Sequence, residues 1–265
     1  MADKKAVFFD IDGTIWDIWN HIPESTVRAI RELRQNGHLA FLNSGRTRAY
    51  IQNPDLLSIG FDGIVSGCGT MIEYEGRTIF LRQIEKEVMA ETIRLIRSYG
   101  FKPILEGPEY LYFDMEDFAE DRYGKKLIAE MGDRLRTIKD EWGKWDVCKF
   151  SCATEGTDLY GCERALKNDF DFMIHNEAVV EVVPKGFHKG TGIQKVCELL
   201  NMDISDTFAV GDSVNDLGML ESAGVSIVMG DGADRAKSIA DYVTTSLHED
   251  GIYKACMHFG LIGGR

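Results

Sequence analysis

Two short acidic segments each follow a run of apolar residues. Asp10 and Asp12 come directly after one run, and Asp212 and Asp216 follow another near the end of the chain. Because ligands of open parallel sheets bind beyond the carboxyl ends of the strands, we expect these carboxylates to meet at one edge. Four carboxylates at one edge would repel each other, and a hard divalent cation held by oxygen ligands relieves that repulsion. The pattern therefore predicts a Mg²⁺ site.

Hydrogen-bond donors stand at other expected strand ends. Ser44, Gly45 and Arg46 follow a second apolar run, Lys189 precedes a helical pattern, and Asn215 lies in the late acidic segment. Hydroxyl, amide and ammonium groups suit the oxygens of a phosphoryl group. Together with a divalent cation, they indicate a site for a small phosphorylated ligand.

Alternating strands and helices would position these residues. The apolar runs at 5–9, 39–42 and 61–65 predict buried parallel strands. Between the first two runs, apolar residues recur at helical spacing, with Ser25 expected to cap the helix and Gly37 to end it. This rhythm predicts right-handed βαβ units and an α/β core with a Rossmann-like, doubly wound parallel sheet.

The pattern changes between residues 83 and 186. Helices are expected at 85–98, 116–131 and 157–167, and strands at 101–105, 110–114, 147–153, 170–175 and 179–183. That order suits a separate α+β domain with an antiparallel sheet. We therefore expect a catalytic core at 1–82 and 187–265, interrupted by an inserted α+β cap domain at 83–186, an ordinary domain size.

Four ordered motifs make the chain resemble the haloacid dehalogenase-like superfamily. They are Asp10-Ile11-Asp12-Gly13-Thr14, Ser44-Gly45-Arg46, Lys189-Gly190 and Gly211-Asp212-Ser213-Val214-Asn215-Asp216. The insert between the second and third motifs, with the tail segments 240–244 and 249–251, resembles the Cof-type branch, which carries a large cap of the C2 (IIB) type. The resemblance spans the whole core.

The resemblance implies a role for each motif residue. Asp10 would attack phosphorus and form an aspartyl-phosphate, and Asp12 would act as general acid and then general base. Mg²⁺ would be held by Asp10, the Asp12 backbone carbonyl and Asp212. The remaining roles are phosphate binding by Ser44, Gly45, Lys189 and Asn215, and orientation of Lys189 by Asp216.

Two positions depart from the usual motifs. Ser44 stands where the family usually has threonine, and the serine keeps the hydroxyl donor. Cys68-Gly69 stands where many relatives carry Asn-Gly. No substrate contact can therefore be carried over to Cys68.

The roles of several other polar and aromatic residues are less clearly indicated by the sequence. Arg46 is expected to be a structural ion-pair partner, and Glu181 is a candidate for substrate specificity in the cap. Trp16 and Trp19 follow the nucleophile, and at least one of them is expected in the core. The remaining candidates, His21, His175 and His188, show no partner spacing and are treated as structural.

The composition limits the classes of partner. With 43 acidic and 30 basic residues, the chain has a formal net charge of -13, which disfavours nucleic acid and anionic membrane surfaces. It contains no apolar run of about 20 residues, and its six cysteines show no Cys-x-x-Cys pair. We expect a cytoplasmic protein with buried thiols.

Three interpretations remain open. The main expectation is a Mg²⁺-dependent phosphatase acting on a small phosphorylated metabolite, with sugar phosphates ahead of phosphorylated vitamins such as pyridoxal phosphate or flavin mononucleotide. A phosphotransferase or phosphosugar mutase would use the same aspartyl-phosphate. A non-catalytic metabolite sensor is the third interpretation, and fold alone does not choose between them.

Overall fold

The computed structural model describes residues 4–118, 122–174 and 179–263. The chain folds into two compact units. The first contains residues 1–45, 52–80 and 188–265, and the second contains residues 46–51 and 81–187.

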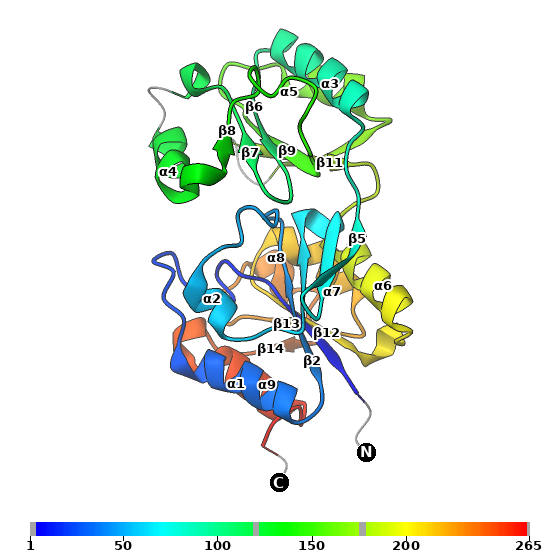
Figure 1. The fold of residues 1–265 in the computed structure, drawn as a ribbon. Coiled ribbons are helices and arrows are strands. Elements are labelled where there is room, and N and C mark those ends of the chain that lie inside the picture. The colour runs from blue at the N-terminus through cyan, green and yellow to red at the C-terminus, as the bar shows by residue number, and fades with distance from the viewer. Residues whose placement is uncertain (1–3, 119–121, 175–178, 264–265) are drawn as a thin grey trace. The chain divides into compact units, whose positions relative to one another are not determined.

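The first unit is built on an eight-stranded sheet (Figure 1). In spatial order its strands are β14 (Tyr242–Val243), β13 (Val225–Val228), β12 (Thr207–Gly211), β1 (Ala6–Phe9), β2 (Leu39–Asn43), β3 (Gly63–Ser66), β4 (Met71–Tyr74) and β5 (Arg77–Leu81). From β14 to β3 every neighbouring pair is parallel, whereas β3 and β4 are antiparallel. The predicted Rossmann-like α/β core is confirmed.

Helices lie on both faces of this sheet. They are α1 (Glu24–Gln35), α2 (Pro54–Ser58), α6 (Lys189–Leu200), α7 (Leu217–Ser222), α8 (Asp234–Lys237) and α9 (Gly251–His258). Ala6 and Phe8 pack in one buried cluster with residues of α6 and α7. Because side chains alternate along a strand, Val7 and Phe9 point to the opposite face, on the side where α1 and α9 lie together (Figure 1). Both faces of β1 are therefore buried, and its run is apolar throughout.

The start of α1 differs from the expectation. Pro23 occupies the N-cap position in an extended conformation and no side chain caps the helix, while the buried Ser25 hydroxyl makes no hydrogen bond. Ser25 is therefore the second residue of the helix and not its cap. Pro23, whose ring fixes φ, occupies the N-cap position instead. The expected end is observed, since Gly37 follows the helix with a φ of 92°.

The hairpin of β4 and β5 was not predicted from the sequence. Glu75 and Gly76 connect the two strands and both have positive φ values, 49° and 75°. Two-residue turns with positive φ at both positions favour a glycine, so the Glu-Gly pair between the strands was the available signal.

The second unit contains a six-stranded sheet. In spatial order its strands are β10 (Phe170–Ile174), β11 (Val179–Pro184), β9 (Lys149–Ala153), β6 (Lys102–Glu106), β7 (Leu111–Tyr112) and β8 (Leu135–Arg136). The pairs from β10 to β7 are antiparallel, but β7 and β8 are parallel. The two-residue strand β8 was missed, because no alternating pattern can be recognised over two residues.

Helices α3 (Lys86–Ser98), α4 (Arg122–Met131) and α5 (Leu159–Leu166) complete the second unit. The expected helix at 116–131 is interrupted: a 3₁₀ turn covers Met115–Asp117, and α4 begins at Arg122. Buried side chains from α3, α5 and the sheet form a separate cluster around Trp145 and Phe150.

Residues 46–51 group with the second unit, although the sequence-based division placed them in the core. Ala49 packs in a cluster with Ile104 and Phe113, and the Tyr50 hydroxyl donates to Glu130 at 2.8 Å. Because residues 46–51 follow Ser44 and Gly45 directly, the sequence suggested that they belong to the core. They group with the second unit because Ala49 is buried in its apolar cluster. The assignment of 83–186 as a functional cap stays a prediction.

Candidate active site

The sheet of the first unit places two acidic residues side by side. Strands β1 and β12 are parallel, with Phe9 opposite Val210. The backbone N–H of Asp10 extends this ladder and donates to the Val210 carbonyl at 2.9 Å. Asp10 and Asp212 therefore leave the same edge of the sheet, as expected.

A buried lysine joins Asp10 to a second carboxylate. Lys189 is the first residue of α6, and its Nζ donates to Asp10 Oδ1 at 2.5 Å and to Asp216 Oδ1 at 2.7 Å. Burial alone would lower the pKa of Lys189, but Asp10 and then Asp216 outweigh it and hold the pKa above its usual value. Lys189 therefore stays protonated between the two carboxylates.

The Asp216 carboxylate stabilises the loop after β12 through hydrogen bonds to its backbone. Its Oδ2 accepts from the backbone N–H groups of Asp212 and Ser213, both at 2.9 Å, while Oδ1 accepts from Lys189. Gly211 makes room for this carboxylate, since a Cβ there would lie 2.7 Å from Asp216. Asp216 is fully buried and has its acceptors occupied, so it is suited to positioning.

Three carboxylates share the single positive charge of Lys189. One oxygen from each of Asp10, Asp212 and Asp216 lies within 4.8 Å of the others. Burial, followed by repulsion from Asp216, raises the pKa of Asp10 well above its ordinary value. The same two causes, in the same order, raise the pKa of Asp212 to about 7.

This donor set fits Mg²⁺. It offers carboxylate oxygens, which are the ligands that Mg²⁺ prefers. A divalent charge would offset the repulsion from Asp216, which adds to burial in raising the pKa of Asp10 and of Asp212. Gly13, with a φ of 81°, leaves the approach to Asp212 open, because a Cβ at Gly13 would lie 2.5 Å from Asp212 Oδ2. Thr14 Oγ1 donates to the other oxygen of Asp212 at 3.1 Å.

Asp12 is held in a turn that follows Asp10. The Trp16 indole Nε1 donates to Asp12 Oδ1 at 2.9 Å, and the Gly13 N–H donates to the Trp16 carbonyl at 2.9 Å. Asp12 is exposed, whereas the Trp16 side chain is buried. One tryptophan is thus in the core, as expected, and Trp19 is 80% exposed.

Ser44 reaches the same sheet edge from β2. Since Phe9 lies opposite Leu42 in the parallel pair, Ser44 follows the strand just beyond the level of Asp10. Its N–H donates to the Val65 carbonyl at 2.9 Å, and its carbonyl accepts from the Cys68 N–H at 3.1 Å. Ser44 is buried and Gly45 is half-buried.

Among the candidates, direct contacts join Asp10, Lys189 and Asp216, and Asp212 lies beside them. Asn215 is exposed in the 3₁₀ turn Val214–Asp216. Arg46 and Glu181 belong to the second unit.

A small pocket of the second unit includes both Arg46 and Glu181. Lys149 also lines this pocket; its side chain is 1% exposed, and its Nζ lies 3.0 Å from Glu181 and 3.6 Å from Glu106. Burial raises the pKa of Glu106, Lys149 lowers it, and Glu181 raises it further. Arg46 also stacks on Tyr50, with its guanidinium carbon 4.6 Å from the ring centroid.

Two further residues support Lys189 and the start of α6. The Asn43 side chain donates to the Lys189 carbonyl at 3.1 Å, and His188 caps α6 by accepting from the Gly190 N–H at 3.1 Å. The structural role expected for His188 is thus observed, and His175 lies outside the described residues. An Asn at the last position of a buried strand was the available signal for Asn43.

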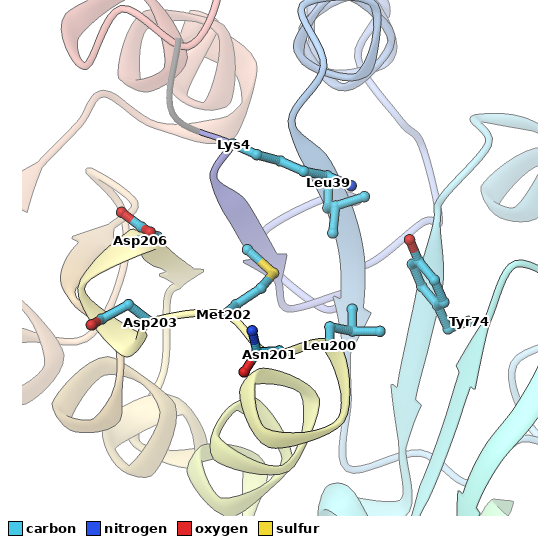
Figure 2. Close-up of a pocket in the computed structure, with 8 residues that line it drawn as sticks. All are labelled: Lys4, Leu39, Tyr74, Leu200, Asn201, Met202, Asp203 and Asp206. Carbon is cyan, nitrogen blue, oxygen red and sulfur yellow. The ribbon is translucent and has the colours of Figure 1, made fainter. Parts of the chain in front are cut away.

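A pocket of the first unit lies at the end of the sheet opposite to Asp10 and Asp212 (Figure 2). Leu39 begins β2, and Met202 and Asp206 precede β12, so the pocket lies at the amino ends of these strands. None of the candidate site residues lines it.

Comparison with known sequences identifies the family. A family model described as haloacid dehalogenase-like hydrolase matches residues 7–256. A Bacillus subtilis (strain 168) protein named "Putative phosphatase YkrA" is 32% identical over 273 residues, covering 98% of this chain and 99% of that protein. From the same organism, "5-amino-6-(5-phospho-D-ribitylamino)uracil phosphatase YitU" is 25% identical over 262 residues, covering 93% and 94%.

Solved structures agree with this match. A protein from Geobacillus kaustophilus HTA426 superposes with a TM-score of 0.84 at 26% identity, covering 98% of this chain and all of that one. The HAD subclass IIB sugar phosphatase BT4131 gives a TM-score of 0.82 at 27% identity, with the same coverage. Among the described residues, no helix combines the length and apolarity needed to span a bilayer. The chain therefore belongs to the haloacid dehalogenase-like hydrolases, in the Cof-type branch, and is a phosphatase.

Proposed function

We propose that the protein hydrolyses a small sugar phosphate by forming an aspartyl-phosphate on Asp10 in a Mg²⁺-dependent reaction. The observation that carries the proposal is the buried contact between Lys189 Nζ and Asp10 Oδ1, beside Asp212. The ammonium holds one carboxylate oxygen, so the other oxygen of Asp10 is left for attack on phosphorus. The names of two similar proteins, a sugar phosphatase and a phosphoribitylamino-uracil phosphatase, support this substrate class.

The proposed first step transfers the phosphoryl group to Asp10. The bond between Asp10 and phosphorus forms, the bond from phosphorus to the sugar oxygen breaks, and Asp12 donates a proton to that oxygen. Ser44, Gly45 and Asn215 would bind the phosphoryl oxygens together with Lys189. Asp10, Asp212 and the Asp12 carbonyl would hold Mg²⁺, which offsets repulsion between the nucleophile and the phosphate.

The proposed second step regenerates the enzyme. Asp12, now ionised, takes a proton from a water molecule that attacks phosphorus, and the bond between phosphorus and Asp10 breaks. The Trp16 indole would keep Asp12 in one orientation through both proton transfers, since it donates to Asp12 Oδ1. The products are inorganic phosphate and the sugar.

Asp10→Asn tests the nucleophile, because the amide keeps the shape of the side chain and removes its nucleophilic oxygen. We expect phosphate release from a panel of sugar phosphates to fall to near background, while Asp234→Asn, an exposed substitution in α8, keeps wild-type activity. Chelation of Mg²⁺ should abolish wild-type activity, and Mg²⁺ should restore it where Ca²⁺ does so poorly. Retention of about a tenth of the activity by Asp10→Asn would contradict the proposal, given the large acceleration such enzymes provide.

A phosphosugar mutase would use the same aspartyl-phosphate and is the second candidate. A hydrolase releases phosphate from a simple aryl phosphate, and it converts a sugar phosphate to phosphate and the free sugar without forming an isomeric sugar phosphate. Product analysis by NMR separates the two, since a mutase would yield a positional isomer without net phosphate release.

We also propose that the second unit selects the leaving group through Glu181 and its neighbours. The chain connectivity supports this, because Arg46, in the Glu181 pocket, follows Ser44 and Gly45 directly, and the segment after Phe187 begins with His188 and Lys189. The cluster of Lys149, Glu106 and Glu181 offers buried charge that can recognise hydroxyl groups of a sugar.

A further inference from the structure

Two histidines and an aspartate gather on the surface of the first unit, apart from the proposed catalytic residues. Asp17 and His21 lie in the loop after Trp16, and His248 lies in the 3₁₀ turn Leu247–Glu249. One ligand atom from each of the three residues lies within 4.8 Å of the other two. The imidazole rings of His21 and His248 are nearly parallel, at 20°, with centroids 5.8 Å apart.

The loop that carries Asp17 and His21 is closed by its own hydrogen bonds. Asp17 Oδ1 accepts from the N–H groups of Trp19 at 2.8 Å and His21 at 3.0 Å, and the Asp17 N–H donates to the His21 carbonyl at 3.2 Å. Asn20 completes the turn with a φ of 61°. These bonds hold the Asp17 carboxylate and the backbone of His21 in place without a ligand.

The second oxygen of Asp17 faces the other segment. Asp17 Oδ2 lies 3.2 Å from His248 Nε2. The turn that presents His248 is itself closed, because the Ser246 hydroxyl donates to Glu249 at 2.8 Å. The cluster thus joins two independently ordered turns that are distant in sequence.

The spacing suits a tetrahedral transition-metal ion. With zinc bonds of about 2.0–2.1 Å, neighbouring ligand atoms of a tetrahedral site lie about 3.3 Å apart, close to the distance between Asp17 Oδ2 and His248 Nε2. Two imidazoles and one carboxylate favour Zn²⁺, Co²⁺ or Ni²⁺, whereas the oxygen ligands of Asp10 and Asp212 favour Mg²⁺. The His248 side chain is 57% exposed, which leaves space for water to complete the coordination.

We propose that Asp17, His21 and His248 bind a Zn²⁺-class divalent cation that fastens the loop after the nucleophile segment to the turn before α9. The ion would replace the direct contact of Asp17 with His248 and add His21 as a third ligand. This site is independent of the proposed phosphatase reaction, because none of its residues belongs to the catalytic cluster.

The test titrates Zn²⁺ by calorimetry into the full chain, stripped of metal and then supplied with excess Mg²⁺. Wild type should bind one Zn²⁺ that Mg²⁺ does not displace, and Co²⁺ should give visible absorption bands of a nitrogen-ligated site. Asp17→Asn keeps the Oδ1 acceptor of the turn and removes the anionic ligand oxygen. This variant and His248→Ala should each weaken Zn²⁺ binding by at least about tenfold.

A matched control is His258→Ala, which removes an exposed histidine of α9 outside the cluster. It should leave the Zn²⁺ affinity unchanged. The Zn²⁺-induced rise in Tm should likewise persist in His258→Ala and disappear in Asp17→Asn, provided the metal-free Tm values match. Unchanged Zn²⁺ affinity in both cluster variants, or no Zn²⁺ bound by wild type, would overturn the proposal and leave an ion pair only.

Discussion

The ammonium group of Lys189 contacts two carboxylates, and a third lies within 4.8 Å of both. A single positive charge therefore lies among three carboxylates. Burial first, and then repulsion from Asp216, raises the pKa of both Asp10 and Asp212. A phosphate dianion entering this edge would meet further repulsion. At the residue scale, Lys189 alone is insufficient for phosphate binding, which is why we place a divalent cation beside Asp212.

Asp12→Asn separates proton transfer from nucleophilic attack. Asparagine keeps an oxygen acceptor for the Trp16 indole but cannot donate a proton to an alkoxide leaving group. We expect kcat for a sugar phosphate to fall by about 10²–10⁴. For aryl phosphates, whose leaving group needs no proton, formation of the aspartyl-phosphate should fall much less in rapid-quench measurements. Equal losses for both substrates would contradict an acid role for Asp12.

His38 should make the stability of the first unit depend on pH. Its Nδ1 accepts from the Lys5 N–H at 3.1 Å, and burial, followed by the charge of Lys5, lowers the pKa of His38 below 6.5. The unfolded chain then binds more protons than the folded one, so stability is lost as pH falls through about 6.5. Urea unfolding between about pH 7.5 and pH 5.5 should show a smaller loss for His38→Gln than for wild type. An identical pH dependence in the two proteins would refute this role.

At the scale of elements, the turn after β3 explains a departure from the family motif. Cys68 has a φ of 57° and a ψ of 38°, in the left-handed region, and its N–H donates to the Ser44 carbonyl. Asparagine tolerates this region better than most residues do. The left-handed backbone at this position is therefore sufficient reason for an Asn in related sequences.

Substitutions at Cys68 test this explanation. The free energy of unfolding of Cys68→Asn should lie within about 1 kcal/mol of the wild-type value, and the variant should retain activity, because the backbone conformation is kept. Cys68→Val should lose about 2 kcal/mol or more, since a β-branched residue is strained at positive φ. Denaturant unfolding and phosphate release measure both effects. The explanation fails if valine is tolerated as well as asparagine.

The ends of buried strands were the elements most open to prediction. The apolar runs before Asp10, Ser44 and Asp212 are local patterns, and parallel pairing carries all three to one edge. The contact of Asp216 with the Asp212 and Ser213 N–H groups is also local in sequence. Such features depend on neighbouring residues, so one sequence suffices to anticipate them.

Features that depend on distant packing were missed. Residues 46–51 join the second unit because Ala49 is buried against Ile104 and Phe113. The β8 strand exists through its pairing with β7 rather than through its own two residues. Likewise, Asp17 and His21 meet His248 from the far end of the chain. The residues around a position do not indicate which residues from elsewhere in the chain will pack against it in the fold.

At the scale of the whole molecule, each unit has its own apolar interior. The cluster containing Phe8 and Val196 draws only on the first unit, and the cluster around Trp145 draws only on the second. The residues proposed for phosphoryl transfer all belong to the first unit. The second unit is therefore not required to supply a catalytic group.

Replacement of residues 83–186 by a Gly/Ser linker tests this division. We expect the shortened protein to retain slow hydrolysis of a small aryl phosphate, because the phosphoryl-binding residues remain. Its kcat/KM for a sugar phosphate should fall sharply, since binding energy from the rest of the substrate is lost. Circular dichroism verifies that the remaining unit is folded.

A point substitution provides the complementary measurement in the full chain. Glu181→Gln should change the ranking of sugar phosphates more than it changes aryl phosphate turnover, and Glu109→Gln, an exposed control in the same unit, should change neither. If the linker variant stays folded and loses both activities equally, the second unit does not determine specificity.

The six buried cysteines divide equally between the two units. Cys68, Cys197 and Cys256 belong to the first unit, and Cys148, Cys152 and Cys162 belong to the second. Burial raises the pKa of Cys197 to about 11 and that of Cys152 well above its ordinary value, so neither forms thiolate readily at neutral pH. An alkylating reagent can then react only when the surrounding structure opens. Peptide mapping after timed alkylation would thus compare how readily each unit opens, using the cysteines that the chain already contains and no introduced probe.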